Sequence, residues 1–267
     1  MRVALVGYTG YWGKKLERCL RELDHQIFDK FTSRNIRELE DTDADCVFIA
    51  SPPDTHYEIA MRAMKLGMDV LVEKPMTMRG SRAEEMAKFA KEKGVILSVD
   101  STLLFTEAFE FLNNLGQSLV SYQSIRLSLP MPQAKINAAW DLVVHDLSIL
   151  DGFRSLTYGG QGMVDGSVAV ASLPLRSGGS AFIMASRAWP EKVRGITLHF
   201  SKESYFWKLD GLYHLDGSKF LEEKEEPLKR MIENFDKRCQ ERQIAGLTDG
   251  DHGARVCSCI EKMFPLY

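Results

Sequence analysis

The sequence lacks any pair of cysteines in a C-x-x-C spacing, and its cysteines are odd in number. There are five of them, and only the last two are close together: Cys19, Cys46, Cys239, Cys257 and Cys259. We therefore expect reduced thiols rather than a disulfide framework. Structural zinc sites usually use closely spaced cysteine pairs, so we expect no bound metal.

The sequence also lacks long hydrophobic runs and an excess of either charge. No stretch approaches the roughly 18 consecutive apolar residues of a membrane-spanning helix, and the first residues do not resemble a signal peptide. The formal net charge is −3, so no basic surface for nucleic acid or an anionic membrane is expected. These absences predict a cytoplasmic globular protein with neither a nucleic acid nor a membrane as its partner.

The first part of the chain alternates short apolar runs with helical patterns. The predicted strands are Val3–Val6, Val47–Ala50, Asp69–Val72 and Val95–Val99. The predicted helices are Tyr11–Leu23, His56–Leu66 and Arg82–Lys93. Alternation of this kind predicts an α/β domain with a doubly wound, parallel sheet of the Rossmann type.

The pattern changes near Gly116, and from Tyr122 onward apolar and polar residues alternate in long runs. This period of two predicts an α+β domain with a predominantly antiparallel, open-faced sheet. The helices expected there are Ala138–Leu150, Leu228–Gln243 and about Gly253–Met263. We place the domains at residues 1–117 and 118–267. An open apolar sheet face needs cover, so we expect a homodimer or homotetramer.

Three glycines, Gly7, Gly10 and Gly13, lie between the first predicted strand and the first predicted helix. Glycine allows a tight turn and lets backbone approach a diphosphate, which the positive end of the following helix attracts. A purely structural turn is the alternative. For the dinucleotide site, the residues expected at this turn are Gly7, Tyr8, Thr9, Gly10, Tyr11, Trp12 and Gly13.

The acidic residue that holds the adenosine ribose of NAD is expected about 20 positions after such a turn. Asp29 lies 19 positions after Gly10, whereas Lys30 and Arg34 suit the 2′-phosphate of NADP. We therefore expect NAD or NADP as the cofactor, with NAD as the first choice. Only 17 residues separate Asp29 from Val47, so part of a strand–helix unit is expected to be missing.

Two reductase families with similar glycine turns do not fit. Acyl-phosphate and semialdehyde reductases use a cysteine in mid-chain, and none lies between Cys46 and Cys239. Short-chain reductases need a Tyr-x-x-x-Lys pair well beyond the turn, whereas Tyr11 and Lys15 match it only inside the turn.

Three further stretches follow the glycine turn in order: "ASPPDTHYEIA" (50–60), "VLVEKP" (70–75) and "WDLVVHDLSIL" (140–150). Together they resemble the glucose–fructose oxidoreductase/inositol dehydrogenase (Gfo/Idh/MocA) family. The resemblance runs nearly end to end, although "INAAWD" and "VDSTLLF" depart from the family pattern. "STLLF" and the 140–150 stretch are more similar to members acting on nucleotide-linked or amino sugars.

The resemblance implies further residues at the dinucleotide site, namely Ser51, Pro52, Pro53, His56, Glu73 and Lys74. His56 is expected either to line that site or cap its helix, or to be a buried histidine with satisfied partners.

The catalytic residues implied are Lys74, Asp141 and His145. Ligands bind at the carboxyl ends of parallel strands, where Lys74 can hydrogen-bond a hydroxyl. Asp141 and His145 are four apart and share a helix face, whereas Asp146 should point away and be structural. Histidine can take a proton from an alcohol as hydride leaves its carbon.

We therefore expect an NAD(P)-dependent oxidoreductase. Its reaction would be hydride transfer between nicotinamide and a secondary hydroxyl of a sugar, nucleotide sugar or polyol. The alternative is a dinucleotide-binding regulator or scaffold of the same fold without turnover.

Overall fold

The computed structural model describes residues 1–32, 35–129 and 136–265, so Arg34 lies outside the described residues. Two compact units emerge, and each is made of two separate stretches of chain. The first unit comprises Met1–Thr102 and Glu226–Cys257, and the second comprises Leu103–Glu225 and Ser258–Tyr267. The domain boundary expected after residue 117 stays a prediction; the compact units differ from it, because residues 226–257 pack with the first unit.

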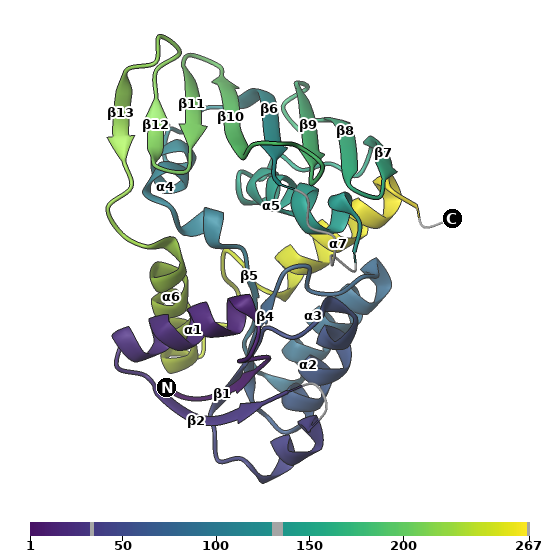
Figure 1. Cartoon of the computed structure of the whole chain (residues 1–267), viewed down its shortest axis with the longest axis vertical. Helices are drawn as coiled ribbons and strands as arrows, with labels where there is room; N and C mark the ends of the chain where they lie inside the picture. The colour runs from purple at the N-terminus through teal and green to yellow at the C-terminus, as the bar shows by residue number, and fades with distance from the viewer. Residues whose placement is uncertain (33–34, 130–135, 266–267) are drawn as a thin grey trace. The chain divides into compact units, whose positions relative to one another are not determined.

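The first unit contains a five-stranded parallel sheet, as expected (Figure 1). Its spatial order is β2-β1-β3-β4-β5. The strands are β1 (Arg2–Val6), β2 (Gln26–Phe31), β3 (Cys46–Ile49), β4 (Asp69–Glu73) and β5 (Leu97–Asp100). The central strands are buried throughout because helices cover both faces of the sheet.

Helices α1 (Tyr11–Glu22) and α6 (Pro227–Glu241) lie on one side of this sheet. Helices α2 (His56–Lys65) and α3 (Gly80–Lys93) lie on the other. Phe235 of α6 packs edge-on against Phe48 of β3, with ring centroids 5.3 Å apart. Helix α7 (Gly250–Met263) begins in this unit. The predicted helices in this unit are confirmed.

The described residues of the shortened region, 24–32 and 35–46, contain a strand but no α-helix. Strand β2 pairs in parallel with β1 at the sheet edge. A 3₁₀ helix, η1 (Ile36–Asp41), connects it to β3 where a full helix would stand in a longer unit. The missing part expected from the sequence is therefore the crossover helix.

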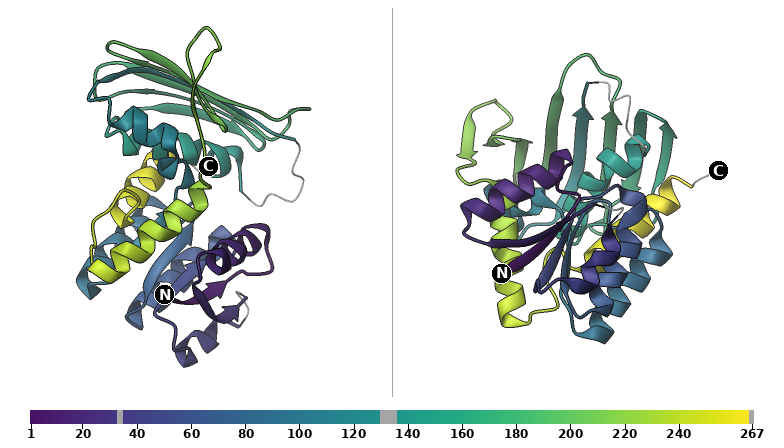
Figure 2. Two further views of the ribbon diagram at one scale, coloured as in Figure 1. Left: turned by 90° about the vertical axis from the view of Figure 1, so that its left-hand side faces the viewer. Right: turned by 60° about the horizontal axis from the view of Figure 1, so that its bottom comes forward.

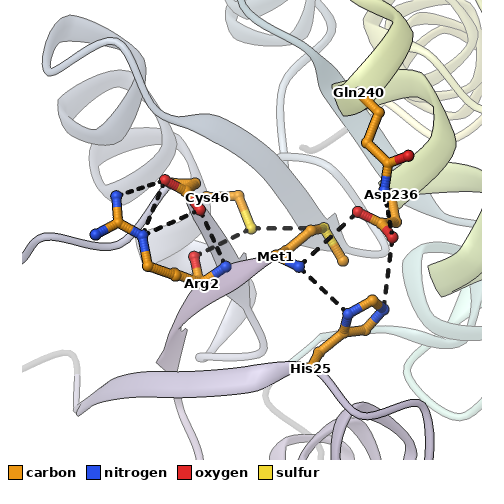
Figure 3. A network of polar contacts seen from close by, with 7 residues as sticks. Met1, Arg2, His25, Cys46, Asp236 and Gln240 are labelled. Atoms are coloured by element: carbon orange, nitrogen blue, oxygen red, sulfur yellow. Dashed lines mark hydrogen bonds and ion pairs between the residues drawn. The ribbon is translucent and has the colours of Figure 1, made fainter.

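A polar network joins α6 to the N-terminal strands (Figure 3). The Met1 amino group lies 3.4 Å from His25 Nδ1 and 4.0 Å from Asp236 Oδ1. His25 Nε2 lies 4.0 Å from Asp236 Oδ2, and Gln240 donates to that oxygen at 3.0 Å. Burial lowers the pKa of His25. These contacts fix the late helix α6 on the first strands of the chain.

The second unit contains an eight-stranded sheet in the order β13-β12-β11-β10-β6-β9-β8-β7. Its strands are β6 (Leu119–Leu127), β7 (Gln161–Asp165), β8 (Val168–Pro174), β9 (Ser180–Ser186), β10 (Val193–Phe200), β11 (Ser204–Lys208), β12 (Gly211–Tyr213) and β13 (Lys219–Glu222). Only the β6–β9 pair is parallel among these described strands. The predominantly antiparallel sheet is thus confirmed.

One face of this sheet is covered by α4 (Glu107–Asn113) and α5 (Val144–Gly152), as the left view of Figure 2 shows. In the part of the chain that the structure describes, no helix covers the opposite face. Ile125 and Phe182 on that face are 46% and 49% exposed. The sheet is therefore open-faced, as expected.

Candidate functional site

The glycine turn connects β1 to α1, and two of its glycines are required by close contacts. Gly7 has φ of +86°, and a Cβ there would lie 2.4 Å from Ala50 O. A Cβ on Gly13 would lie 2.2 Å from Gly7 O. A Cβ on Gly10 would meet Gly7 O only at 3.3 Å. Gly7 therefore sets the turn, and Gly13 lets α1 pack directly on it.

The start of α1 fits an anionic ligand. Gly10 is the N-cap and supplies no side chain to cap the first N–H groups, and the first turn has no acidic residue. Lys15 Nζ lies 4.7 Å from the ring centroid of Tyr11 and 4.8 Å from that of Trp12. An uncapped helix start with a nearby cation favours phosphate groups. The residues present therefore suit the diphosphate of a dinucleotide.

Asp29 and Lys30 lie on β2, the strand beside β1. Thr42 Oγ1 donates a hydrogen bond to Asp29 Oδ2. Lys30 Nζ lies 2.6 Å from Glu17 Oε1 and 5.5 Å from the ring centroid of Tyr8, a residue of the glycine turn. Both candidates for reading the 2′ position of the ribose therefore have partners within the protein.

His56 connects the segments that follow β3 and β4. Its ring is 1% exposed, with Nε2 2.8 Å from Ser51 O and Nδ1 2.9 Å from Pro75 O. Burial lowers its pKa, and a neutral ring donates to only one of these two carbonyls. His56 thus holds the Ser51-Pro52-Pro53 segment beside Pro75. These contacts match the expected alternative of a buried, hydrogen-bonded histidine.

Lys74 directly follows β4 at the carboxyl edge of the parallel sheet and is half-buried. Its neighbour Glu73 pairs in register with Asp100, the last residue of β5. Both carboxyl side chains are buried. Burial raises the pKa of Asp100 to about 6, and the charge of Lys74 opposes that rise. Asp100 was not predicted from the sequence, where its signal is an acidic residue at the end of a buried strand.

Asp141 and His145 lie on a helical segment that is otherwise buried. Between residues 138 and 151, these two side chains are partly exposed and all the remaining side chains are buried. The expected regular helix begins with a π-helical turn, η4 (Ala139–Val143), before α5. Such turns inside helices often occur at functional sites. Arg187 Nη1 lies 3.3 Å from Asp141 Oδ2 and fixes that carboxylate.

Asp146 points into the core of the second unit and is fully buried. It accepts a hydrogen bond from Tyr122 Oη at 2.7 Å and lies 3.2 Å from Arg126 Nη2. The prediction of a structural role for Asp146 is confirmed. Its partners were not predicted, because nothing in the local sequence links β6 to α5.

Lys74 belongs to the first unit, whereas Asp141 and His145 belong to the second. Their convergence on one substrate stays a prediction. Among residues 1–32, 35–129 and 136–265, no group of three or more metal-ligating side chains occurs, and all five cysteines are free thiols. No helix in the same ranges is long and apolar enough to cross a bilayer.

Residues 14–101 match the model of the Gfo/Idh/MocA oxidoreductase family, described by its NAD-binding Rossmann fold. UDP-N-acetylglucosamine 3-dehydrogenase of Acidithiobacillus ferrooxidans is 28% identical over 165 residues, covering 58% of this chain and 53% of that protein. The NADP(+)-dependent scyllo-inositol 2-dehydrogenase IolW of Bacillus subtilis is 28% identical over 160 residues, covering 52% and 44%. The aligned part spans about half the length of these curated relatives, or less.

Solved structures show the same fold over nearly the whole chain. The structure of the Acidithiobacillus ferrooxidans enzyme, GnnA, has a TM-score of 0.87 at 22% identity and covers 98% of this chain and 96% of its own. GenD2 from gentamicin A biosynthesis, solved with NAD, has a TM-score of 0.79 at 15% identity, with coverage of 99% and 93%. Residues 14–101 thus match the NAD-binding domain of the Gfo/Idh/MocA oxidoreductases, and nearly the whole chain has the fold of these solved structures.

Proposed function

We propose that this protein is an NAD(P)-dependent oxidoreductase that transfers hydride between nicotinamide and a secondary hydroxyl of a sugar, nucleotide sugar or polyol. The observation that carries the proposal is the 138–151 segment, which buries every side chain except Asp141 and His145. In this buried segment the two side chains that reach solvent are a carboxylate and an imidazole, and this combination suits proton transfer. Relatives named as UDP-N-acetylglucosamine and inositol dehydrogenases support ring hydroxyls as the substrate class.

The dinucleotide is assigned to the carboxyl edge of the parallel sheet. When bound, it supplies the acceptor or donor of the hydride. Residues 7–13 hold its diphosphate against the uncapped start of α1. Asp29 or Lys30 reads the 2′ position of the ribose, and Ser51–Pro53, Glu73 and Lys74 complete the nicotinamide half. His56 contributes by fixing the Ser51 and Pro75 segments rather than by facing the ligand.

Proton transfer is assigned to His145. In the oxidative direction its imidazole accepts the hydroxyl proton, which contributes on the order of 10²–10⁴-fold to the rate. Lys74 donates a hydrogen bond to the same oxygen and stabilises negative charge there. Asp141, held by Arg187, orients the imidazole or binds a neighbouring hydroxyl. Holding these groups in register supplies the remaining acceleration.

A substrate panel tests this proposal. Formation of NADH or NADPH is followed by absorbance with UDP-sugars, free sugars and inositols, for wild type and for His145→Asn. We expect turnover of at least one ring alcohol and a loss of kcat of at least about 100-fold in the variant. Dinucleotide affinity and Tm should stay unchanged. His199→Asn is the matched control, because His199 lies on β10 and contacts Ser204.

Two outcomes would reject the proposal. Tight dinucleotide binding without turnover of any substrate would favour a regulator of the same fold. Equal losses of kcat and of dinucleotide affinity in Lys74→Ala would show that Lys74 only shapes the cofactor site.

We also propose that the protein forms a homodimer or homotetramer through the open face of the eight-stranded sheet. Exposed apolar side chains such as Ile125 and Phe182 support this assignment.

A further inference from the structure

Two carboxyl groups meet beside Lys74. Glu73 ends β4 and Asp100 ends β5, and the two residues are register partners in neighbouring parallel strands. They are 5% and 2% exposed. Both therefore lie at the sheet edge where the dinucleotide is assigned, and Lys74 is the residue that follows Glu73.

The Asp100 carboxyl group is incompletely satisfied. Among the described residues, Asp100 Oδ2 is buried and has no hydrogen-bond partner. A buried carboxylate oxygen without a donor is costly, and two adjacent buried carboxylates repel each other. One proton held between the two groups removes both costs. The pair then carries one negative charge instead of two.

The charges around Asp100 favour this arrangement. Burial raises the pKa of Asp100 to about 6; the positive charge of Lys74, the backbone N–H of Thr102, the Glu73 carboxyl group and the charge of Lys15 lower it, in that order. On α7, His252 Nε2 lies 3.2 Å from the hydroxyl oxygen of Ser101, the residue that follows Asp100. Lys74 is therefore the main cation acting on Asp100.

We propose that Asp100 is a positioning residue for Lys74 and acts through a proton that it shares with Glu73. The proton lies between one carboxyl oxygen of each residue, and the remaining negative charge attracts the Lys74 ammonium group. When a second proton binds, the pair becomes neutral and Lys74 loses this attraction. The expected effect on catalytic activity rests on the role proposed above for Lys74, whereas the shared proton does not.

The first experiment needs no substrate. Carboxyl carbons of aspartate are labelled with ¹³C and titrated by NMR, and the signal lost in Asp100→Asn identifies Asp100. We expect a midpoint near 6 in wild type. We expect Lys74→Met to raise this midpoint, because a favourable positive charge is removed. Lys14→Met is the matched control and should change it far less, because Lys14 is not among the main groups that shift the pKa of Asp100.

Two results would overturn the inference. One is an Asp100 midpoint close to the ordinary value of about 3.9. The other is a midpoint that Lys74→Met leaves where it was. Neither measurement needs a substrate. Either result would therefore reject this inference without bearing on whether the protein turns over a ring alcohol, so the two failures are distinguishable.

The second experiment uses the substrate found by the panel. Asp100→Asn should lower kcat by about 10- to 100-fold at pH 7.5, with little change in dinucleotide affinity, because a displaced lysine misplaces the hydroxyl. It should also remove the decline of kcat that the pair causes near pH 6. Asp69→Asn changes a buried carboxylate at the other end of β4 and should keep the wild-type pH profile. Identical profiles for Asp100→Asn and wild type would refute the inference.

Discussion

Tyr122 Oη donates a 2.7 Å hydrogen bond to Asp146 Oδ1, and neither side chain reaches solvent. Arg126 is four residues further along the same strand, and its Nη2 atom lies 3.2 Å from the same oxygen. The two donors come from β6, whereas the carboxylate comes from α5. This buried network fixes the helix that carries His145 against the sheet of its own unit.

Removing the buried carboxylate should cost more than removing one donor. Asp146→Ala leaves the Arg126 charge buried and unpaired, so we expect a loss of about 3–5 kcal/mol in the free energy of unfolding. Tyr122→Phe leaves Arg126 in place and should cost about 1–3 kcal/mol. Urea denaturation followed by circular dichroism measures both. Tyr213→Phe removes the more exposed hydrogen bond to Asp210 and serves as the control; equal losses in all three variants would contradict the network's role.

Two glycine-to-alanine substitutions in the glycine turn should affect thermal stability differently. Gly13→Ala places a methyl group 2.2 Å from Gly7 O, so the turn or α1 must shift and Tm should fall by several degrees. Gly10→Ala meets its nearest neighbour at 3.3 Å and should keep Tm within a few degrees of wild type. If Gly10 lets backbone approach a diphosphate, this variant should still bind dinucleotide more weakly. Thermal melts and NADH fluorescence titrations separate the two effects, and a Gly13→Ala variant as stable as wild type would refute the packing argument.

The two histidines His25 and His56 should make the fold less stable in acid. Burial lowers the pKa of each in the folded state, so the unfolded chain binds more protons as pH falls. Their contribution is fully present above the unfolded value of about 6.5 and is lost as pH falls below it. Each contributes a slope of up to about 1.4 kcal/mol per pH unit. His25→Gln should reduce the slope of unfolding free energy between pH 6.5 and 5; an unchanged slope in His25→Gln would count against this assignment.

The open face of the eight-stranded sheet should control oligomeric state. Ile125→Glu and Phe182→Glu place charges on exposed apolar positions of that face, so an interface there should dissociate. Sedimentation velocity should show an oligomer for wild type and a monomer for the double variant. Lys88→Glu, on the exposed side of α3, is the control. A wild-type monomer, or a double variant of unchanged mass, would exclude this interface.

Much of the parallel sheet was predictable because its strands are buried on both faces. Val3–Val6 and Val47–Ile49 are continuous apolar runs, which are typical of strands buried on both faces. The edge strand β2 escaped prediction because it includes the charged residues Asp29 and Lys30 and only its last residue, Phe31, is buried. Its pairing with β1 is a tertiary contact that local composition does not reveal.

The position of Lys74 followed from the sequence, because a charged residue after a buried strand marks the ligand edge of a parallel sheet. The surroundings of the other candidates did not. The π-helical turn at Asp141 gives the same apolar pattern as a regular helix. Its partner Arg187 and the Glu73–Asp100 pair depend on strands far apart in the chain. Such contacts require the folded sheets to be known.

The discontinuous make-up of the first unit limits how this protein can be divided. Helix α6 returns after residue 225 to cover Phe48 with Phe235 and to bind the Met1 amino group through Asp236. A truncated gene product ending near residue 117 would leave this apolar surface of the sheet bare and prone to aggregate. Exchanging the cofactor module between homologous genes therefore requires two splice points, with the 226–257 segment transferred together with the N-terminal portion.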